Sequence, residues 1–132
     1  MSKLFLKKEK NEEFFHICEK IRSEAKEYIS TRDIAVRAEA TECSSFFTSV
    51  AYIKWLILQM NTDRYVPSSI PHIAEKHNEI YNRYKTSLSE NNGKSISWHA
   101  KEIFKQGAPR FYLSEDYATI LYYKLMNKSI TY

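Results

Sequence analysis

The chain has little glycine and proline, with two and three residues respectively among 132. These residues supply most tight turns between short strands, so their scarcity argues against an all-β sandwich or barrel and favours helices. Glycine-rich phosphate and dinucleotide loops are missing as well, because Gly93 and Gly107 stand alone in the sequence. No Gly-x-Ser-x-Gly nucleophile motif occurs. We therefore expect a helical protein that is not an enzyme.

Cysteine is also scarce. Cys18 and Cys43 have no Cys-x-x-Cys or Cys/His ligand spacing around them, so the sequence indicates no disulfide framework and predicts a reduced, cytoplasmic setting. The four histidines are at positions 16, 72, 77 and 99, and no two have the i, i+4 spacing with a carboxylate that zinc-hydrolase helices use. We interpret His72 and His77 as part of a solvated helix face. No metal and no cofactor are expected.

Long apolar runs are missing too. The longest run, around Trp55–Met60, is interrupted by Lys54 and Gln59 and is far shorter than a membrane span. The apolar stretch at the start of the chain is too short for a signal peptide. Hydrophobic residues make up 43% and charged residues 27% of the chain, an ordinary globular balance. We expect a soluble protein with no membrane partner.

Apolar residues recur at intervals of three and four along most of the chain, which is the pattern of amphipathic helices. Serines in front of these stretches are the expected N-caps: Ser30 (or Thr31), Ser49, Ser97 and Ser114. The pattern predicts six helices, near residues 11–28, 31–38, 49–60, 70–88, 97–104 and 114–125. The predicted fold class is all-α, a compact helical bundle of about six helices.

The two halves of the chain resemble one another. A motif of two aromatic residues, a serine and a tyrosine occurs twice, as Phe46-Phe47-x-Ser49-x-x-Tyr52 and as Phe111-Tyr112-x-Ser114-x-x-Tyr117. Internal similarity of this kind predicts a duplicated three-helix unit with pseudo-twofold symmetry. Within a single domain, 1–132, the first unit is expected to span residues 1–62 and the second residues 69–132.

One segment resembles the helix-turn-helix entry of TetR-type bacterial repressors. It is Thr31-Arg32-Asp33-Ile34-Ala35-Val36-Arg37-Ala38, with Phe46-Phe47 after it. In that family a Thr-x-x-Ile-Ala-x-x-Ala stretch opens the motif and an aromatic pair follows the recognition helix. Glu39 stands where the family carries glycine. The stretch Val50–Met60 is apolar nearly all round, so we expect it to be buried and not to read base edges as a recognition helix.

A second segment, Pro109-Arg110-Phe111-Tyr112-Leu113-Ser114, resembles the Pro-Arg-Phe-Tyr-[Val/Ile]-Ser signature of small uncharacterised helical proteins of bacterial mobile elements. The resemblance implies a place among such proteins and no particular activity. The first half of the chain has Ser44-Ser45 in place of Pro109-Arg110, so a function seated on Arg110 would belong to the second half alone.

The chain carries a net charge of +4 and has a pI near 9.0, which favours encounter with polyanions. The residues expected to contact nucleic acid lie around the second aromatic turn and on a basic N-terminal arm that also holds Lys3 and Lys10. They are Arg110, Lys105, Lys101, Tyr112, Lys7 and Lys8. The cations would bind phosphates and Tyr112 would stack on bases. The alternative is that Phe111 and Tyr112 are a hydrophobic anchor wedged between helices.

Two functions are consistent with these features. The first is a non-enzymatic, DNA-associated accessory protein of a bacterial mobile element, which binds the phosphate backbone with little sequence reading. The second is a protein-interaction module or homodimer that uses the aromatic turns and the ten tyrosines as its contact surface.

Overall fold

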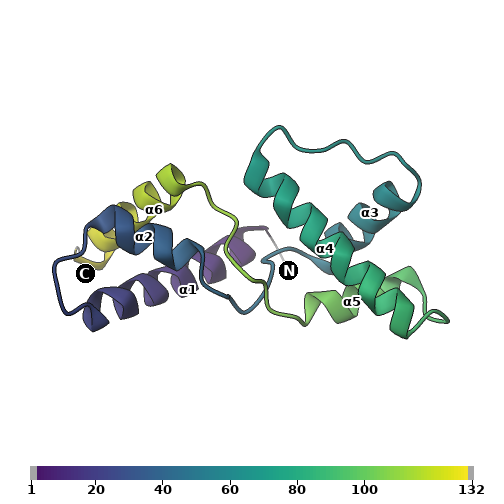
Figure 1. Ribbon diagram of the computed structural model, residues 1–132, viewed down its shortest axis with the longest axis horizontal. Coiled ribbons are helices and arrows are strands. Elements are labelled where there is room, and N and C mark those ends of the chain that lie inside the picture. Colours follow the sequence, from purple (N-terminus) through teal and green to yellow (C-terminus); the bar gives the residue numbers. More distant parts are fainter. Residues whose placement is uncertain (1–2, 131–132) are drawn as a thin grey trace. The chain divides into compact units, whose positions relative to one another are not determined.

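The computed structural model describes residues 3–130, with the side chains of residues 6–128. This part of the chain is all-α, as predicted (Figure 1). It contains six helices: α1 (Lys3–Glu24), α2 (Thr31–Glu39), α3 (Val50–Asn61), α4 (Pro71–Glu90), α5 (Ile96–Phe104) and α6 (Glu115–Ile130). Within residues 3–130, no helix is long and apolar enough to cross a membrane.

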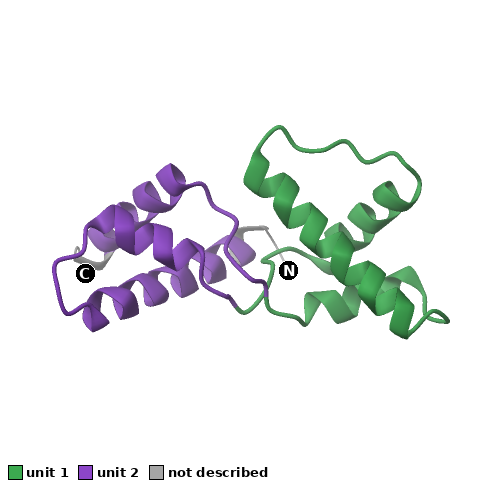
Figure 2. Ribbon diagram, in the orientation of Figure 1, with its two compact units in different colours: residues 1, 44–107 green, residues 2–43, 108–132 purple. Residues whose placement is uncertain are grey.

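The helices form two compact units whose boundaries differ from the predicted ones (Figure 2). Unit 1 is the continuous segment 44–107, with α3, α4 and α5. Unit 2 combines the segments before and after it, so that α6 packs against α2 and α1. The prediction that the units are residues 1–62 and 69–132 was therefore wrong. A helix packs where its apolar face is covered, and α3 is covered by α4 and α5, not by the helices that precede it.

The core of unit 2 contains large aromatic rings. Phe14 of α1 is fully buried and meets Phe111 edge to face, with the ring centroids 5.4 Å apart. Tyr122 of α6 is also fully buried and contacts the ring of Phe15. Residue 43 and residue 108 form an isolated antiparallel bridge, with N–O distances of 2.9 and 3.0 Å. This bridge joins the chain after α2 to the segment that leads into α6.

The core of unit 1 is mostly aliphatic. Its fully buried aliphatic members are Ile53, Leu56, Ile57, Ile80, Ala100 and Ile103. The expectation that Val50–Met60 is buried all round was wrong, because Trp55 is 50% exposed and Leu58 is 39% exposed. A three-helix unit covers only one side of each helix, which leaves the outer face of α3 uncovered.

Serine side chains begin four of the helices. Ser30, Ser49 and Ser114 accept a hydrogen bond from the backbone N–H three residues ahead, as predicted. The cap of α5 is Ser95, which accepts from the Trp98 N–H at 3.1 Å, and not Ser97, which lies inside the helix. The periodic pattern had misplaced this helix start by one to two residues because Ile96 is itself helical.

Several local features recur 65 residues apart. Helix α5 repeats the length of α2, and the N-caps Ser30 and Ser95 have this spacing. Two residues with positive φ share it as well, Phe47 at 54° and Tyr112 at 59°. Each lies two residues before a capping serine, where the backbone reverses to enter the next helix.

Candidate nucleic-acid interface

Glu39, the last residue of α2, is the centre of a buried polar cluster in unit 2. Its exposed fraction is 2%, and its Oε2 accepts hydrogen bonds from Arg110 Nε at 2.7 Å and from the Tyr112 N–H at 3.1 Å. Arg110 Nη2 donates to the other carboxylate oxygen, which makes the pair bidentate. The Phe111 N–H donates to the Glu39 carbonyl at 2.9 Å. Glu39 thus holds the segment before α6 in place.

This cluster changes the role predicted for Arg110. Its side chain is 42% exposed, but the fork of its guanidinium is held by a carboxylate that is 3% exposed. If the Arg110 guanidinium bound a phosphate instead, the buried Glu39 carboxylate would be left as an unpaired charge, which is strongly unfavourable. Arg110 is therefore a structural residue, and its assignment to a free phosphate-binding surface was wrong.

Tyr112 is buried as well, with an exposed fraction of 8%. Its ring belongs to the core of unit 2, next to Phe111 and Leu113, so the anchor interpretation is confirmed. The ring has no open face on which a base could stack. The predicted stacking role of Tyr112 was therefore wrong. Burying a large aromatic ring in the core stabilises the fold more than leaving it exposed for a base would.

The predicted basic arm is the first part of α1. Lys7 and Lys8 are exposed on this helix, and Lys8 Nζ lies 4.0 Å from Glu12 one turn later. Lys10 points inward: burial and then the nearby Lys7 ammonium lower its pKa. The side chain of Lys3 lies outside the described residues. Lys7 and Lys8 remain accessible cations of unit 2.

Lys101 and Lys105 lie in unit 1, on one side of α5. Trp98 shares this side, three residues before Lys101, and Lys94 lies in the turn just before the helix. Lys94 Nζ stands over the Trp98 ring, 5.5 Å from its centroid. We call Lys94, Trp98, Lys101 and Lys105 the α5 ridge. Its three lysines are exposed and its tryptophan is half-buried.

The α5 ridge is weakly neutralised by its neighbours. Lys105 Nζ lies 3.1 Å from Glu102 Oε1, but the lysine side chain is 68% exposed. An ion pair this open contributes about 0–1 kcal/mol and is readily exchanged for another anion. Lys94 and Trp98 were missed by the sequence analysis, which followed the aromatic turns. The alternation of Lys and Trp at helical spacing was the signal that identifies them.

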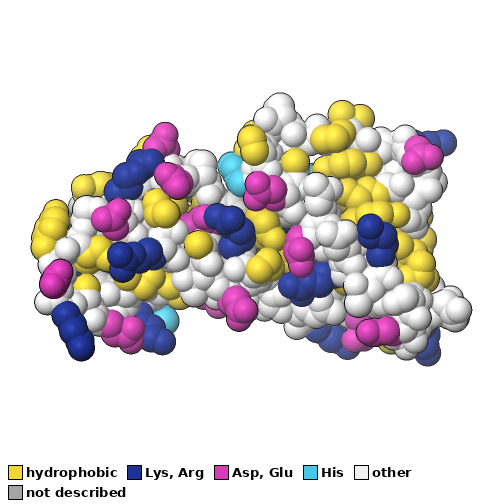
Figure 3. Space-filling view, in the orientation of Figure 1, with side chains coloured by type: hydrophobic (Ala, Val, Ile, Leu, Met, Phe, Trp, Pro, Cys, Tyr) yellow, Lys and Arg dark blue, Asp and Glu magenta, His cyan; other side chains and the backbone are white. Residues whose placement is uncertain are grey.

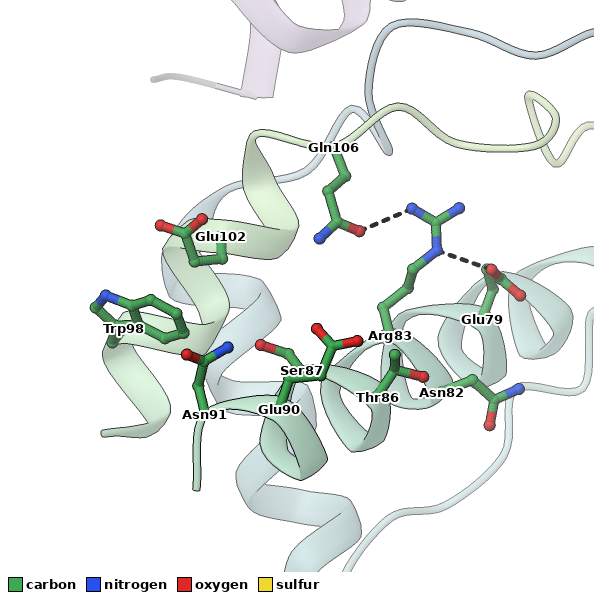
Figure 4. Close-up of a pocket in the computed structure, with 10 residues that line it drawn as sticks. All are labelled: Glu79, Asn82, Arg83, Thr86, Ser87, Glu90, Asn91, Trp98, Glu102 and Gln106. Carbon is green, nitrogen blue, oxygen red and sulfur yellow. Dashed lines mark hydrogen bonds and ion pairs between the residues drawn. The ribbon is translucent and has the colours of Figure 1, made fainter. Parts of the chain in front are cut away.

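A cavity of about 330 Å³ lies beside the ridge, between α4 and α5 (Figure 4). Its lining is polar apart from one aromatic ring: Glu79, Asn82, Arg83, Thr86, Ser87, Glu90, Asn91, Trp98, Glu102 and Gln106. Trp98 and Glu102 come from α5, so the cavity and the ridge share a wall. Arg83 crosses one end of it.

Arg83 is held by several neighbours in unit 1. Its Nε donates to Glu79 Oε1 at 3.0 Å, and its Nη1 donates to Gln106 Oε1 at 2.9 Å and to the Gly107 carbonyl at 3.0 Å. Its guanidinium carbon also lies 5.2 Å from the centroid of the Phe46 ring. Arg83 therefore closes one end of the cavity, and its positive charge is paired with Glu79.

Two histidines are buried in unit 1, and one corrects the sequence analysis. His77 is 7% exposed, with Tyr52 Oη 2.8 Å from its Nε2 and Tyr65 Oη 2.9 Å from its Nδ1. Burial and then Lys76 lower its pKa. The interpretation of His77 as part of a solvated face was wrong, because two tyrosine hydroxyls satisfy both ring nitrogens in the interior. His99 is fully buried and bonds Ser87 Oγ through Nδ1 at 2.7 Å.

Both units expose an apolar helix face. On α3 it consists of Tyr52, Trp55 and Leu58, and on α6 of Tyr117, Ile120 and Tyr123. The two sets are 65 residues apart position by position. Figure 3 shows hydrophobic side chains gathered over unit 1 where α3 and the segment after it lie.

The six predicted site residues are divided between the units. Lys101 and Lys105 belong to unit 1, and the other four to unit 2. Among the residues that the structure describes, no group of three or more histidines, cysteines and carboxylates is arranged to hold a metal. No family model, no curated protein and no solved structure matches this chain, so the α5 ridge and the cavity beside it stand on their own geometry.

Proposed function

We propose that the protein is a non-enzymatic accessory protein that binds nucleic acid through its phosphate backbone, with the α5 ridge of unit 1 as the contact surface. The observation that carries the proposal is the row of three exposed lysines around Trp98. A row of exposed lysines can follow successive phosphates, and an indole between them offers a surface on which a base can stack. The likeness of residues 109–114 to mobile-element proteins suggests such an element, in the cytoplasm, as its setting.

The charge of the chain supports this choice of unit. Unit 1 carries eight lysines and arginines against five carboxylates, whereas unit 2 is nearly balanced. An excess of positive charge on one unit raises the local concentration of a polyanion and speeds its encounter. Lys7 and Lys8 would be secondary phosphate contacts on unit 2.

Fluorescence anisotropy with a labelled random duplex and a matching single strand, repeated across a salt series, tests the proposal. The variant Lys101→Glu/Lys105→Glu reverses two ridge charges at exposed positions. We expect weaker binding at low salt and a log-log salt slope reduced by about 1.4 for the single strand and about 1.8 for the duplex, because about 0.7 and 0.9 of a counterion respectively are released per phosphate contact and two contacts are lost.

A matched control is Lys20→Glu/Lys26→Glu, which makes the same change in net charge at exposed positions of unit 2. If both double variants bind equally well, the ridge is not the contact surface. Flat anisotropy of the unchanged protein at low salt would contradict nucleic-acid binding altogether. Arg110→Glu is unsuitable for this test, since it would place two carboxylates together at Glu39 and unfold unit 2.

The second candidate is a protein-interaction module, and the exposed apolar faces of α3 and α6 favour it. Phe46, Phe111 and Tyr112 are buried, so of the two aromatic pairs only Phe47, which is half-buried, could contribute to a contact surface. Tyr123, which is 52% exposed, remains available. If the protein self-associates through these faces, Trp55→Ala/Tyr123→Ala will lower its mass by light scattering. An unchanged mass would argue against that role.

We also propose that the chain arose by duplication of a three-helix unit. The recurrence of caps, positive-φ residues and exposed apolar faces at a spacing of 65 residues supports it. In such a repeat the third helix of each half would pack with the first two helices of the other half.

A further inference from the structure

The cavity between α4 and α5 has the opposite electrostatic character to the ridge beside it. Glu90 and Glu102 bring carboxylates to its wall, while its one cation, Arg83, is already paired with Glu79. A phosphate would be repelled from the interior and attracted to the lysines at the rim. The site therefore suits a ligand whose anionic part stays outside and whose inserted part is neutral and rich in hydrogen-bond donors.

The lining also prescribes the shape of the inserted group. Trp98 supplies a flat aromatic wall, and Asn91 and Gln106 supply amides that can donate or accept. The volume of about 330 Å³ is at the small end for ligand sites and holds one planar heterocycle with its sugar outside. Figure 4 shows Glu90 and Ser87 on α4 facing the α5 side of the cavity.

Two lysines of the ridge, Lys94 and Lys105, contact residues that line the cavity. Lys94 lies over the ring of Trp98, and Lys105 contacts Glu102, so each touches a residue of the cavity wall. A nucleotide strand whose phosphates follow the ridge would thus bring a base to the mouth of the cavity. A duplex keeps its bases stacked, whereas a single strand can turn one out at little cost.

We infer that the partner is a single-stranded nucleic acid and that the cavity binds one unstacked base, with guanine bound more tightly than the other bases. This inference rests on the proposed function. Guanine presents N1–H and N2–H side by side on its Watson–Crick edge, and a carboxylate accepts both in parallel. Glu90 receives this edge while Trp98 stacks on the ring, and Glu102, which is paired with Lys105, adds negative charge to the same wall. Thymine offers one donor and two carbonyls, which the carboxylates disfavour.

Intrinsic tryptophan fluorescence tests this inference, because the chain contains two tryptophans in different surroundings. Trp55→Phe leaves Trp98 as the sole tryptophan, and Trp98→Phe leaves Trp55 on the exposed face of α3. The probes are a short oligothymidylate and the same strand with one central guanine. We expect the guanine strand to quench Trp98 but not Trp55, and to bind about tenfold more tightly than oligothymidylate.

Glu90→Gln/Glu102→Gln should abolish the preference for guanine while leaving binding of oligothymidylate at least as tight. The control Glu75→Gln, at an exposed position of α4 outside the cavity, should retain it. Salt-dependent binding of both strands without quenching of Trp98 or preference for guanine would overturn the base site and leave the phosphate contact standing. If the unchanged protein shows no salt-dependent binding of either strand, the proposed function itself is overturned.

Discussion

Glu39 shows how one buried charge organises unit 2. Its carboxylate accepts from the Arg110 guanidinium and from the Tyr112 N–H, and its carbonyl accepts from the Phe111 N–H. A buried carboxylate is tolerated only where its oxygens are hydrogen-bonded and its charge is matched. The Arg110 guanidinium and the Tyr112 N–H meet that requirement, and together with the bond from the Phe111 N–H to the Glu39 carbonyl they fix the approach to α6.

Glu39→Ala should therefore destabilise the protein by about 1–3 kcal/mol, because it leaves the buried Tyr112 N–H without its acceptor, whereas the partly exposed Arg110 guanidinium can be solvated. Urea unfolding followed by circular dichroism measures the change. Glu42→Ala, at an exposed position nearby, is the control and should shift stability by less than about 0.5 kcal/mol. Equal stability of the two variants would mean that the Glu39 cluster does not hold unit 2 together.

His77 makes the stability of unit 1 depend on pH. Burial lowers its pKa below the usual 6.5, so between that value and the folded-state pKa the unfolded chain binds the proton and the folded chain does not. Stability is then full above about pH 6.5 and falls as the pH drops below it. The contribution of one histidine to this slope is at most about 1.4 kcal/mol for each pH unit.

The variant His77→Gln should flatten this part of the profile, with the midpoint of urea unfolding measured from about pH 7.5 to about pH 5.5. Glutamine can still bond one tyrosine hydroxyl but does not titrate. His16→Gln, at an exposed position of α1, is the control. A slope that His77→Gln leaves unchanged would show that other groups set the acid sensitivity.

At the scale of the element, α5 and its flanking residues combine a cap, a buried face and a basic face. Ile103 and Ala100 face the core, and Trp98 and Lys101 lie toward solvent. The Ser95 hydroxyl orients the first turn by accepting the Trp98 N–H. The cap thus positions the backbone that carries the tryptophan of the ridge.

Ser95→Ala should cost about 1 kcal/mol of stability, the usual cost of losing an N-cap acceptor. Ser97→Ala, two residues later and inside the helix, should be neutral or slightly stabilising because alanine has the higher helix propensity. Thermal unfolding of the two variants compares them directly. A larger loss for Ser97→Ala would place the helix start where the sequence pattern had put it.

At the scale of the molecule, the two units differ in how the chain builds them. Unit 1 is one continuous segment, 44–107, whereas unit 2 is closed only when α6 returns to α1 and α2. Contacts between residues distant in sequence must first overcome the entropy of closing the loop between them. Unit 1 can therefore keep its helices packed when unit 2 opens.

Phe14→Ala removes a fully buried ring of unit 2 and should destabilise that unit by about 3–5 kcal/mol. Native-state hydrogen exchange should then show faster exchange in α1, α2 and α6, with α3, α4 and α5 still protected. Ile57→Ala makes the converse change in unit 1. Equal loss of protection throughout the chain would show that the units unfold as one cooperative body.

The sequence by itself determined the fold class, because helical periodicity, serine caps and the scarcity of glycine are local properties. Six helices, three of the four expected caps and the anchoring aromatics Phe111 and Tyr112 followed from it. The boundary errors occurred where the pattern is ambiguous: α1 begins at Lys3 rather than near residue 11, and its end at Glu24 precedes the exposed Tyr28.

Only the tertiary structure decided which helices share a core and which charges are free. Arg110 and Lys101 look alike in a sequence, but one is held by the distant Glu39 and the other is exposed. The pairing of α6 with α2 and the cavity beside Trp98 likewise depend on contacts between distant residues. Local pattern sets what each segment can form, and the exclusion of water between segments selects their partners.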